Sequence, residues 1–320
     1  MNKLSTMAVL AAGALALTAC SGTGEEEPAS DEESQDVTIA VVTHGAPDDA
    51  FWSVVKAGSD RAGEDLGIDV EYNSDEDVTA QAELIDQAVA DEVDGVVVSM
   101  ANPDGLEDSV GAAVDAGIPV ITINSGVDQF AEFGAITHIG QSEDVAGEAA
   151  GTKFKELGAT KLLCVIHEAG NIGLEQRCAG AEKTFGGTVE RLQVDGADTA
   201  KAKETISAAL QSDDSIDAVL ALNGQVALGS TQAVADIGTE TVTGTFDLSS
   251  DVIAEIQDGT IAFAIDQQPY VQGYLGVQFL YLKAINGNDV GGGQPVNSGP
   301  ALVTQENADQ VAEFTEQGTR

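Results

Sequence analysis

Polar side chains follow most of the strand-length apolar runs in this 320-residue chain. Amides and carboxylates predominate among them. Amides both donate and accept hydrogen bonds, and carboxylates accept from hydroxyls, so together they suit a ligand with many hydroxyl groups. Any one polar loop means little, but their accumulation predicts a binding cleft. The positions are Thr43-His44-Gly45, Ser99 to Asn102, Asn124-Ser125-Gly126, His167-Glu168, Asn223-Gly224-Gln225, Phe246-Asp247 and Asp266-Gln267-Gln268.

The elements that must position these residues form a regular alternation. Apolar runs such as Thr38–Thr43, Gly95–Ser99 and Lys161–Ile166 are separated by helix-period segments such as 51–66 and 142–157. Continuous apolar strands between helices are typical of parallel sheets covered on both faces. The runs fall into two series, which predicts an α/β protein with two similar doubly wound parallel-sheet domains. Ligands of such sheets lie beyond the carboxyl ends of the strands.

The N-terminus predicts export. Lys3 precedes the apolar residues 7–19, which are too few to cross a hydrocarbon core of about 30 Å, so residues 1–19 are interpreted as a signal peptide. They end in Leu17-Thr18-Ala19-Cys20, which resembles the bacterial lipobox and implies lipidation of Cys20; the alternative is a buried thiol. Residues 20–36 are small and acidic, and we expect a disordered tether. These features predict a lipid-anchored protein on the extracytoplasmic face of the cell membrane.

The charge is strongly negative, with 54 Asp and Glu against 13 Lys and Arg and a net charge of −41. Such a surface repels nucleic acid, which argues against a DNA-binding role. Acidic surfaces also occur in proteins that work at high salt, so the excess carries no information about the ligand.

Two cysteines remain in the body of the chain, Cys164 and Cys178. An exported protein can form disulfides, and a bridge closing this loop would contribute about 3 kcal/mol in the chain-entropy model. Two buried thiols are the alternative.

Catalytic and cofactor motifs are missing from the sequence. It has no GxGxxG or Walker pattern between a strand and a helix and no GxSxG nucleophile elbow, so we expect neither an enzyme nor a cofactor. His44, His138 and His167 lack metal-ligand spacing, and a metal site is not expected.

An ordered set of motifs from about Val37 to Gln305 resembles the ribose-binding-protein family of type I periplasmic binding proteins. The motifs are Asp49-Ala50-Phe51-Trp52, Ile118 to Thr122, Arg177 to Gly180, Asn223 with Ala227-Leu228-Gly229, Phe246-Asp247 and Asp266 to Pro269. The resemblance implies two lobes joined by a three-crossover hinge. The first would comprise residues 37–139 and 268–299, and the second residues 140–267 and 300–320.

The resemblance also implies the ligand-binding residues: Asp49, Phe51, Trp52, Ser99, Asn124, Arg177, Asn223, Asp247 and Gln267. Phe51 and Trp52 can pack on the C–H faces of a sugar, and Arg177 can bridge ring and hydroxyl oxygens.

Six of these positions also have a structural alternative. Asp49 could instead cap a helix, Trp52 could anchor a core, and Arg177 could form an ion pair with Glu168 or Glu175. Turn formation alone could explain Asn223, Asp247 or Gln267.

One position departs from the family pattern. Asn124-Ser125 stands where ribose-binding members commonly carry Asp-Arg, which argues against ribose and leaves other pentoses, hexoses, inositols and linear polyols open. The resemblance implies a monomeric binding protein that delivers its ligand to the permease of an ABC importer by cleft closure. A sugar-sensing lipoprotein that signals to a membrane receptor is the alternative. A repressor with this core would need a basic DNA-binding segment where residues 21–36 are acidic.

Overall fold

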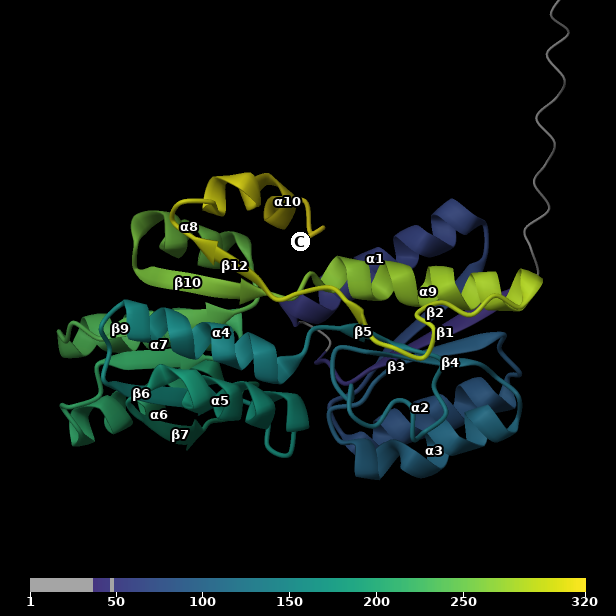
Figure 1. Ribbon diagram of the computed structural model, residues 1–320, viewed down its shortest axis with the longest axis horizontal. Coiled ribbons are helices and arrows are strands. Elements are labelled where there is room, and N and C mark those ends of the chain that lie inside the picture. Colours follow the sequence, from purple (N-terminus) through teal and green to yellow (C-terminus); the bar gives the residue numbers. More distant parts are fainter. Residues whose placement is uncertain (1–36, 47–48) are drawn as a thin grey trace, which may run out of the picture. The chain divides into compact units, whose positions relative to one another are not determined.

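The computed structural model describes residues 37–46 and 49–320. The predicted signal peptide, Cys20 and the acidic tether lie outside the described residues. The described strands form two six-stranded sheets, each covered by its own helices (Figure 1). This arrangement confirms the predicted fold class of two doubly wound α/β lobes, and we call them the first and the second lobe in chain order.

The sheet of the first lobe has the order β11-β5-β4-β3-β1-β2, and its strand pairs are all parallel. Every residue of β3 and β4 is buried, whereas β2 at the edge alternates between exposed and half-buried residues. That contrast is expected where helices cover both faces of the middle of a sheet. The strands are β1 (Thr38–Thr43), β2 (Asp69–Ser74), β3 (Gly95–Ser99), β4 (Val120–Ile123), β5 (His138–Gly140) and β11 (Val296–Asn297).

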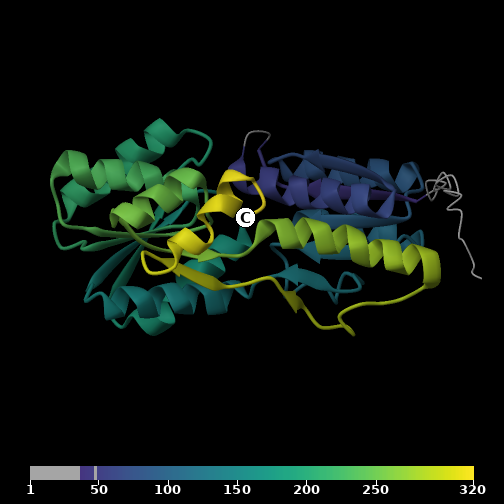
Figure 2. The same ribbon diagram turned by 90° about the horizontal axis from the view of Figure 1, so that it is seen from above.

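Two pairs of helices cover this sheet. The helices α1 (Ala50–Leu66) and α9 (Pro269–Asn286) lie side by side on one face (Figure 2), and α2 (Val78–Ala90) and α3 (Pro103–Asp115) cover the other. The close approach of α1 and α9 depends on Gly58, because a Cβ there would lie 2.1 Å from the carbonyl oxygen of Tyr270.

The sheet of the second lobe has the order β12-β10-β9-β8-β6-β7. Its pairs are parallel except that β12 runs antiparallel to β10, a departure from the predicted all-parallel sheet. The chain reaches β12 directly from β11, and an antiparallel neighbour needs no helical crossover. The strands are β6 (Lys161–Ile166), β7 (Thr188–Gln193), β8 (Ala218–Ala221), β9 (Val242–Phe246), β10 (Ile261–Asp266) and β12 (Ala301–Thr304).

The helices of the second lobe also form two layers. One face is covered by α4 (Glu143–Glu156) and α5 (Ile172–Phe185). The other is covered by α6 (Thr199–Ser212), α7 (Gly224–Ile237) and α8 (Ser250–Asp258), with η1 (Ala308–Gln310) and α10 (Ala312–Glu316) packed against α8.

The chain passes between the lobes three times, after β5, after β10 and after β11. The connecting residues are 141–142, 267–268 and 298–300. These short links confirm the three-crossover architecture. The exact residues assigned above to each lobe remain a prediction.

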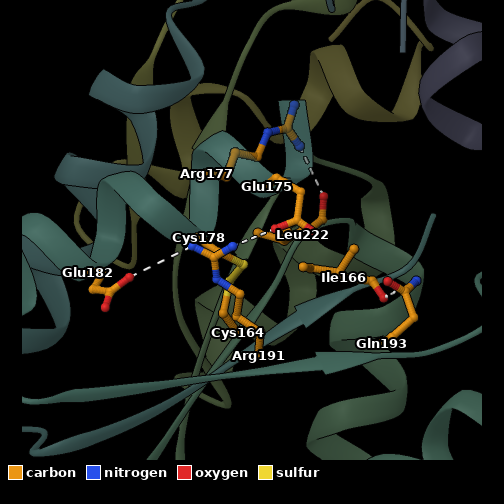
Figure 3. The surroundings of a disulfide bond; sticks show 9 residues. All are labelled: Cys164, Ile166, Glu175, Arg177, Cys178, Glu182, Arg191, Gln193 and Leu222. Carbon is orange, nitrogen blue, oxygen red and sulfur yellow. Dashed lines mark hydrogen bonds and ion pairs between the residues drawn. A yellow bond between two sulfur atoms is a disulfide. The ribbon is translucent and has the colours of Figure 1, made fainter. Parts of the chain in front are cut away.

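Cys164 in β6 and Cys178 in α5 form a disulfide that fastens this helix to the sheet (Figure 3). Both cysteines are fully buried. The bond therefore lies inside the core of the second lobe and fixes the helix that carries Arg177.

Reduction of this disulfide is expected to lower the free energy of unfolding by about 3 kcal/mol, because the bond closes a loop with a sequence separation of 14 residues. Urea unfolding with and without a reducing agent measures the difference. The double variant Cys164→Ala/Cys178→Ala should not respond to the reducing agent. An unchanged unfolding midpoint in the reduced wild-type protein would contradict the expectation.

Candidate functional site

Two adjoining cavities lie where the carboxyl ends of the strands of the two lobes face each other. The outer cavity has a volume of about 580 Å³, within the range of roughly 300–1,000 Å³ usual for small-molecule sites. The inner pocket is much smaller, about 40 Å³. Both are lined by residues that follow strands in both lobes. They share His44, Asp49, His167, Glu168, Asn171 and Asn223.

The structure brings most of the predicted site residues together. Asp49 and Asn223 line both cavities. The inner pocket alone is lined by Phe51, Trp52, Asn124, Arg177, Asp247 and Gln267.

Ser99 is the exception, because it lines neither cavity and is fully buried. Its Oγ accepts a hydrogen bond from the backbone N–H of His44 at 3.0 Å and lies 2.6 Å from Nδ1 of the same residue. Ser99 therefore contacts His44 and holds it at the cavity wall. A direct contact between Ser99 and a ligand remains only a prediction.

Asp49 caps helix α1 and also faces the cavities. Its Oδ1 accepts hydrogen bonds from the backbone N–H groups of Phe51 at 2.8 Å and Trp52 at 3.2 Å. Burial raises the pKa of Asp49 despite these bonds. The capping role considered for this residue is therefore present, and it holds the carboxylate at the wall of the cavity.

Phe51 and Trp52 form an aromatic corner of the inner pocket. The two rings meet edge to face with centroids 5.0 Å apart, and Trp52 makes a second such contact with His44 at 4.6 Å. Trp52 is only 6% exposed and packs into the core of the first lobe, whereas Phe51 is half-buried. Gly45 leaves room for the indole, since a Cβ there would lie 2.0 Å from its Cδ1. Trp52 thus combines core packing with a place in the pocket wall.

A chain of hydrogen bonds runs along the floor of the inner pocket from one lobe to the other. Ser125 Oγ donates to Asn124 Oδ1 at 2.9 Å, and Asn124 Nδ2 donates to Gln267 Oε1 at 2.9 Å. Gln267 Nε2 then donates to Asp247 Oδ1 at 2.7 Å. Gln267 lies in the second crossover, so this chain links the hinge to both lobes.

Asn124 and Asp247 have left-handed backbone conformations, with φ of 62° and 67°. Such conformations are costly for residues with a side chain, and they concentrate at functional sites. Each residue directly follows a strand, β4 or β9. Both side chains line the inner pocket, where the hydrogen-bond chain holds them.

Asp247 has the most perturbed carboxyl group in the pocket. Its side chain is nearly fully buried, and burial raises its pKa to about 7, although Arg177 and the hydrogen bond from Gln267 act in the opposite direction. Asp49 and Glu143 raise the pKa further through repulsion. The group is therefore divided between charged and neutral forms near neutral pH.

Arg177 is ion-paired, but with a partner that the sequence did not indicate. Its Nε lies 2.6 Å from Oε2 of Glu143 and its Nη2 lies 2.9 Å from Oε1, a bidentate pair in which both side chains are buried. Its Nη1 donates to the carbonyl oxygen of Leu222 at 3.1 Å (Figure 3). The alternatives of Glu168 or Glu175 as partner are therefore wrong.

Close packing of α4 against α5 explains the choice of Glu143. Gly147 and Gly180 lie at the contact, where a Cβ on Gly147 would be 2.2 Å from the carbonyl oxygen of Arg177. The first turn of α4 thus reaches the guanidinium. Glu175 instead pairs with Arg191 on the surface.

Comparison with known proteins decides the family. A model of the periplasmic binding protein domain matches residues 39–289. A carbohydrate transporter from Acidothermus cellulolyticus 11B, solved in complex with myo-inositol, is 42% identical, with a TM-score of 0.88 over 89% of this chain and all of that one. The chain belongs to the periplasmic binding protein family. Its members are solute-binding components of transport systems and not enzymes, and the resemblance to the ribose-binding group is confirmed.

Curated relatives of this binding protein are more distant. The xylose/arabinose-binding protein XylF of Sulfolobus acidocaldarius is 26% identical over 72% of this chain, which spans 61% of the length of that protein. The fructose import binding protein FruE of Bifidobacterium longum is 28% identical, over 81% of this chain and 83% of its own length.

Four residues that line both cavities were not among the predicted ligand-binding residues: His44, His167, Glu168 and Asn171. Asn171 caps α5 and donates to Glu168 Oε2 at 2.6 Å, and His44 Nε2 lies 3.9 Å from the same oxygen. For His44, His167 and Glu168, the signal in the sequence was that each closely follows a predicted strand. Asn171 precedes a helix, and a capping residue gives no sign from sequence that it faces a cavity.

His138 lies away from the cavities. It is fully buried in β5, its Nδ1 is 2.9 Å from the hydroxyl of Thr122, and burial lowers its pKa to about 3. Across residues 37–46 and 49–320, no cluster of His, Cys, Asp and Glu is arranged to hold a metal ion. In the same residues, no helix combines the length and the apolar character needed to cross a membrane.

Proposed function

We propose that this protein is an extracytoplasmic, lipid-anchored binding protein that captures a cyclitol of the inositol type and delivers it to the permease of an ABC importer. The observation that carries the proposal is the inner pocket, where carboxylate, amide and guanidinium groups from both lobes meet an aromatic corner. The 42% identical neighbour, which was solved with myo-inositol, supports this ligand class.

The chemistry of the pocket fits a hydroxylated ring. The aromatic rings of Phe51 and Trp52 suit the apolar C–H side of the ring. Amides at Asn124, Asn223 and Gln267 both donate and accept, and the carboxylate of Asp247 accepts from hydroxyls. A closed pocket of this kind rejects a wrong isomer, because each buried polar group left without a partner costs about 1–3 kcal/mol.

The geometry also accounts for how the ligand would be enclosed. The lobes already touch beside the cavities, where the backbone N–H of Ile172 donates to the carbonyl oxygen of Ala101 at 3.0 Å and Gln176 donates to Asp128 at 2.8 Å. With these contacts formed, the inner pocket has a volume of about 40 Å³ and the adjoining outer cavity about 580 Å³. Separation and closure of the lobes about the three crossovers would admit and retain the ligand.

A fluorescence titration tests the ligand class, because Trp52 is the sole tryptophan of the chain and lies in the pocket wall. We expect a saturable change with myo-inositol at concentrations at least tenfold lower than with ribose, xylose or xylitol. A response to a pentose alone, or to none of these solutes in either moderate or high salt, would contradict the proposed ligand.

A further inference from the structure

Helix α5 of the second lobe contacts the first lobe at two separate loops. The backbone N–H of Ile172, the first residue of the helix, donates to the carbonyl oxygen of Ala101, which lies between β3 and α3, at 3.0 Å. One turn later, Gln176 Nε2 donates to Asp128 Oδ2 at 2.8 Å, and Asp128 lies between β4 and β5. The N-terminal end of α5 therefore binds two loops of the other lobe at once.

The first turn of α5 is suited to this contact. The first N–H groups of a helix have no partner within the helix, so the N–H of Ile172 is free to bind a carbonyl oxygen of the other lobe. Gly173 lets the lobes approach closely, because a Cβ there would lie 3.2 Å from Ser125 Oγ, closer than an ordinary van der Waals contact. A larger residue at this position would have to displace Ser125.

The contact shares its helix with the pocket but uses different side chains. Arg177 lines the inner pocket, and Cys178 fastens α5 to β6. Gln176 and its partner Asp128 line neither cavity. Consecutive residues of a helix point about 100° apart around its axis, so Gln176 can bind the first lobe while Arg177 is directed into the pocket.

The bond between Gln176 and Asp128 joins two protein groups that come from different lobes. It can form only when the lobes have met, and it therefore stabilises the closed form by the same amount whichever ligand is enclosed. Its acceptor is a carboxylate, and hydrogen bonds to a charged acceptor are stronger than those between neutral groups. Asp128 is exposed and Gln176 is half-buried, so the pair can be altered without disturbing a core.

We propose that Gln176 and Asp128 are positioning residues that hold the lobes closed and thereby set the rate at which the ligand leaves, whereas the pocket sets which ligand is chosen. The inference rests on the proposed function and adds to it a pair of residues outside the pocket. Changes at the contact between two bodies act mainly on their dissociation, because the contact forms only after they have met.

An exchange of the amide and the carboxylate between the two positions tests the inference. Gln176→Glu places two carboxylates face to face and should favour the open form. Asp128→Asn in the same chain restores a donor, because the Asn amide can donate to the new Glu through side chains of the same combined length. The double variant should therefore recover the behaviour of the wild type, which would not follow if Gln176→Glu merely damaged the fold.

Stopped-flow fluorescence of Trp52, the sole tryptophan, follows myo-inositol in these variants. We expect Gln176→Glu to raise the dissociation rate roughly tenfold, less so at high salt, and to leave the association rate within about twofold. The ratio of the affinities for myo-inositol and scyllo-inositol should not change. Gln87→Glu is the matched control, because Gln87 donates to Asp91 at the same 2.8 Å within the first lobe, and it should change neither rate.

Small-angle X-ray scattering of the ligand-free proteins tests the contact without a ligand. Gln176→Glu should enlarge the radius of gyration, and adding Asp128→Asn should restore the value of the wild type. Equal radii in the three proteins, or a double variant as impaired as the single one, would overturn the inference and leave the proposed function standing.

The remaining outcomes separate the inference from the proposed function. A changed ratio of the affinities for the two inositols in Gln176→Glu would overturn the division between retention and selection. Failure of both inositols to bind, with radii that change as expected, would overturn the proposed ligand and support the role of Gln176 and Asp128 in closure.

Discussion

Replacing Asp247 by Asn is expected to weaken binding of the cyclitol by roughly 100-fold or more. The carboxylate lies in the floor of the inner pocket, and hydrogen bonds to a charged acceptor are worth about 1.5–3 kcal/mol each. The amide of Asn can still accept from Gln267, so the hydrogen-bond chain along the floor should persist. The loss then falls on the ligand, and calorimetric titration of wild-type and variant protein measures it.

The same substitution is expected to stabilise the ligand-free protein above neutral pH. Burial raises the pKa of Asp247 to about 7, so the folded state favours the protonated carboxyl. That contribution is fully present below the ordinary pKa of about 4 and is lost as the pH rises through 7. Asn carries no charge at any pH, so the stability of the variant relative to the wild type should rise by up to about 4 kcal/mol between pH 4 and pH 8.

Urea unfolding of both proteins between pH 5 and pH 8 measures this difference. Subtracting the wild-type from the variant free energy removes the titration of the other groups, such as His44, His167 and Glu168. Asp86→Asn, an equivalent change on the exposed face of α2, should show neither effect. Normal binding by the Asp247→Asn variant would contradict the role of Asp247 in binding the ligand. A stability difference between variant and wild type that does not grow with pH would contradict the raised pKa of Asp247.

Replacing Arg177 by Ala is expected to lower the free energy of unfolding by about 3–5 kcal/mol. The change leaves Glu143 charged and without its cation, although the side chain of Glu143 is only 1% exposed. It also removes the stacking of the guanidinium over the ring of Phe246, whose centroid lies 4.4 Å from Cζ. Chemical denaturation measures the loss, and any effect on ligand binding must be measured at a temperature where the variant is folded.

Arg191→Ala provides the matched control. Arg191 forms an ion pair at 2.5 Å with Glu175, which lies in the same helix as Arg177 (Figure 3). Unlike Arg177, its side chain is 40% exposed. Exposed pairs contribute at most about 1 kcal/mol. Similar losses of unfolding free energy in Arg177→Ala and Arg191→Ala would contradict the expectation that the buried ion pair contributes more to stability than the exposed one.

Much of the fold could be predicted because the central strands are continuous apolar runs. Thr38–Thr43, Gly95–Ser99 and Lys161–Ile166 are strands with the bounds predicted for them. Because helices bury both faces of these strands, nearly every residue in them is apolar, and such a run is easy to recognise in a sequence. The short strands β5, β11 and β12 lack that pattern, since two to four residues at the side of a sheet are fixed by pairing and not by their own composition.

The candidate site could be predicted in part for a similar reason. Asn124, Asn223, Asp247 and Gln267 follow strands, and parallel strands bring their carboxyl ends to one edge. Partners are harder to predict than positions. Glu143 reaches Arg177 only because glycines let two helices approach closely, and the sequence contains no sign of that distance.

Glu168 illustrates the limit most clearly. Its place after β6 put it among the polar residues that predict the cleft, but in a chain with 54 acidic residues nothing in the sequence marked it as a ligand-binding residue. Only the structure shows that it lines the same pocket as Asp49, with His44 and His167 beside it.

Calorimetric titration of the purified protein with myo-inositol tests the central claim most directly. The account predicts saturable binding of one ligand per chain, which Asp247→Asn weakens by roughly 100-fold or more and Asp86→Asn leaves intact. The absence of heat with myo-inositol, in a protein shown to be folded by its cooperative unfolding, would contradict the assignment of this pocket to a cyclitol.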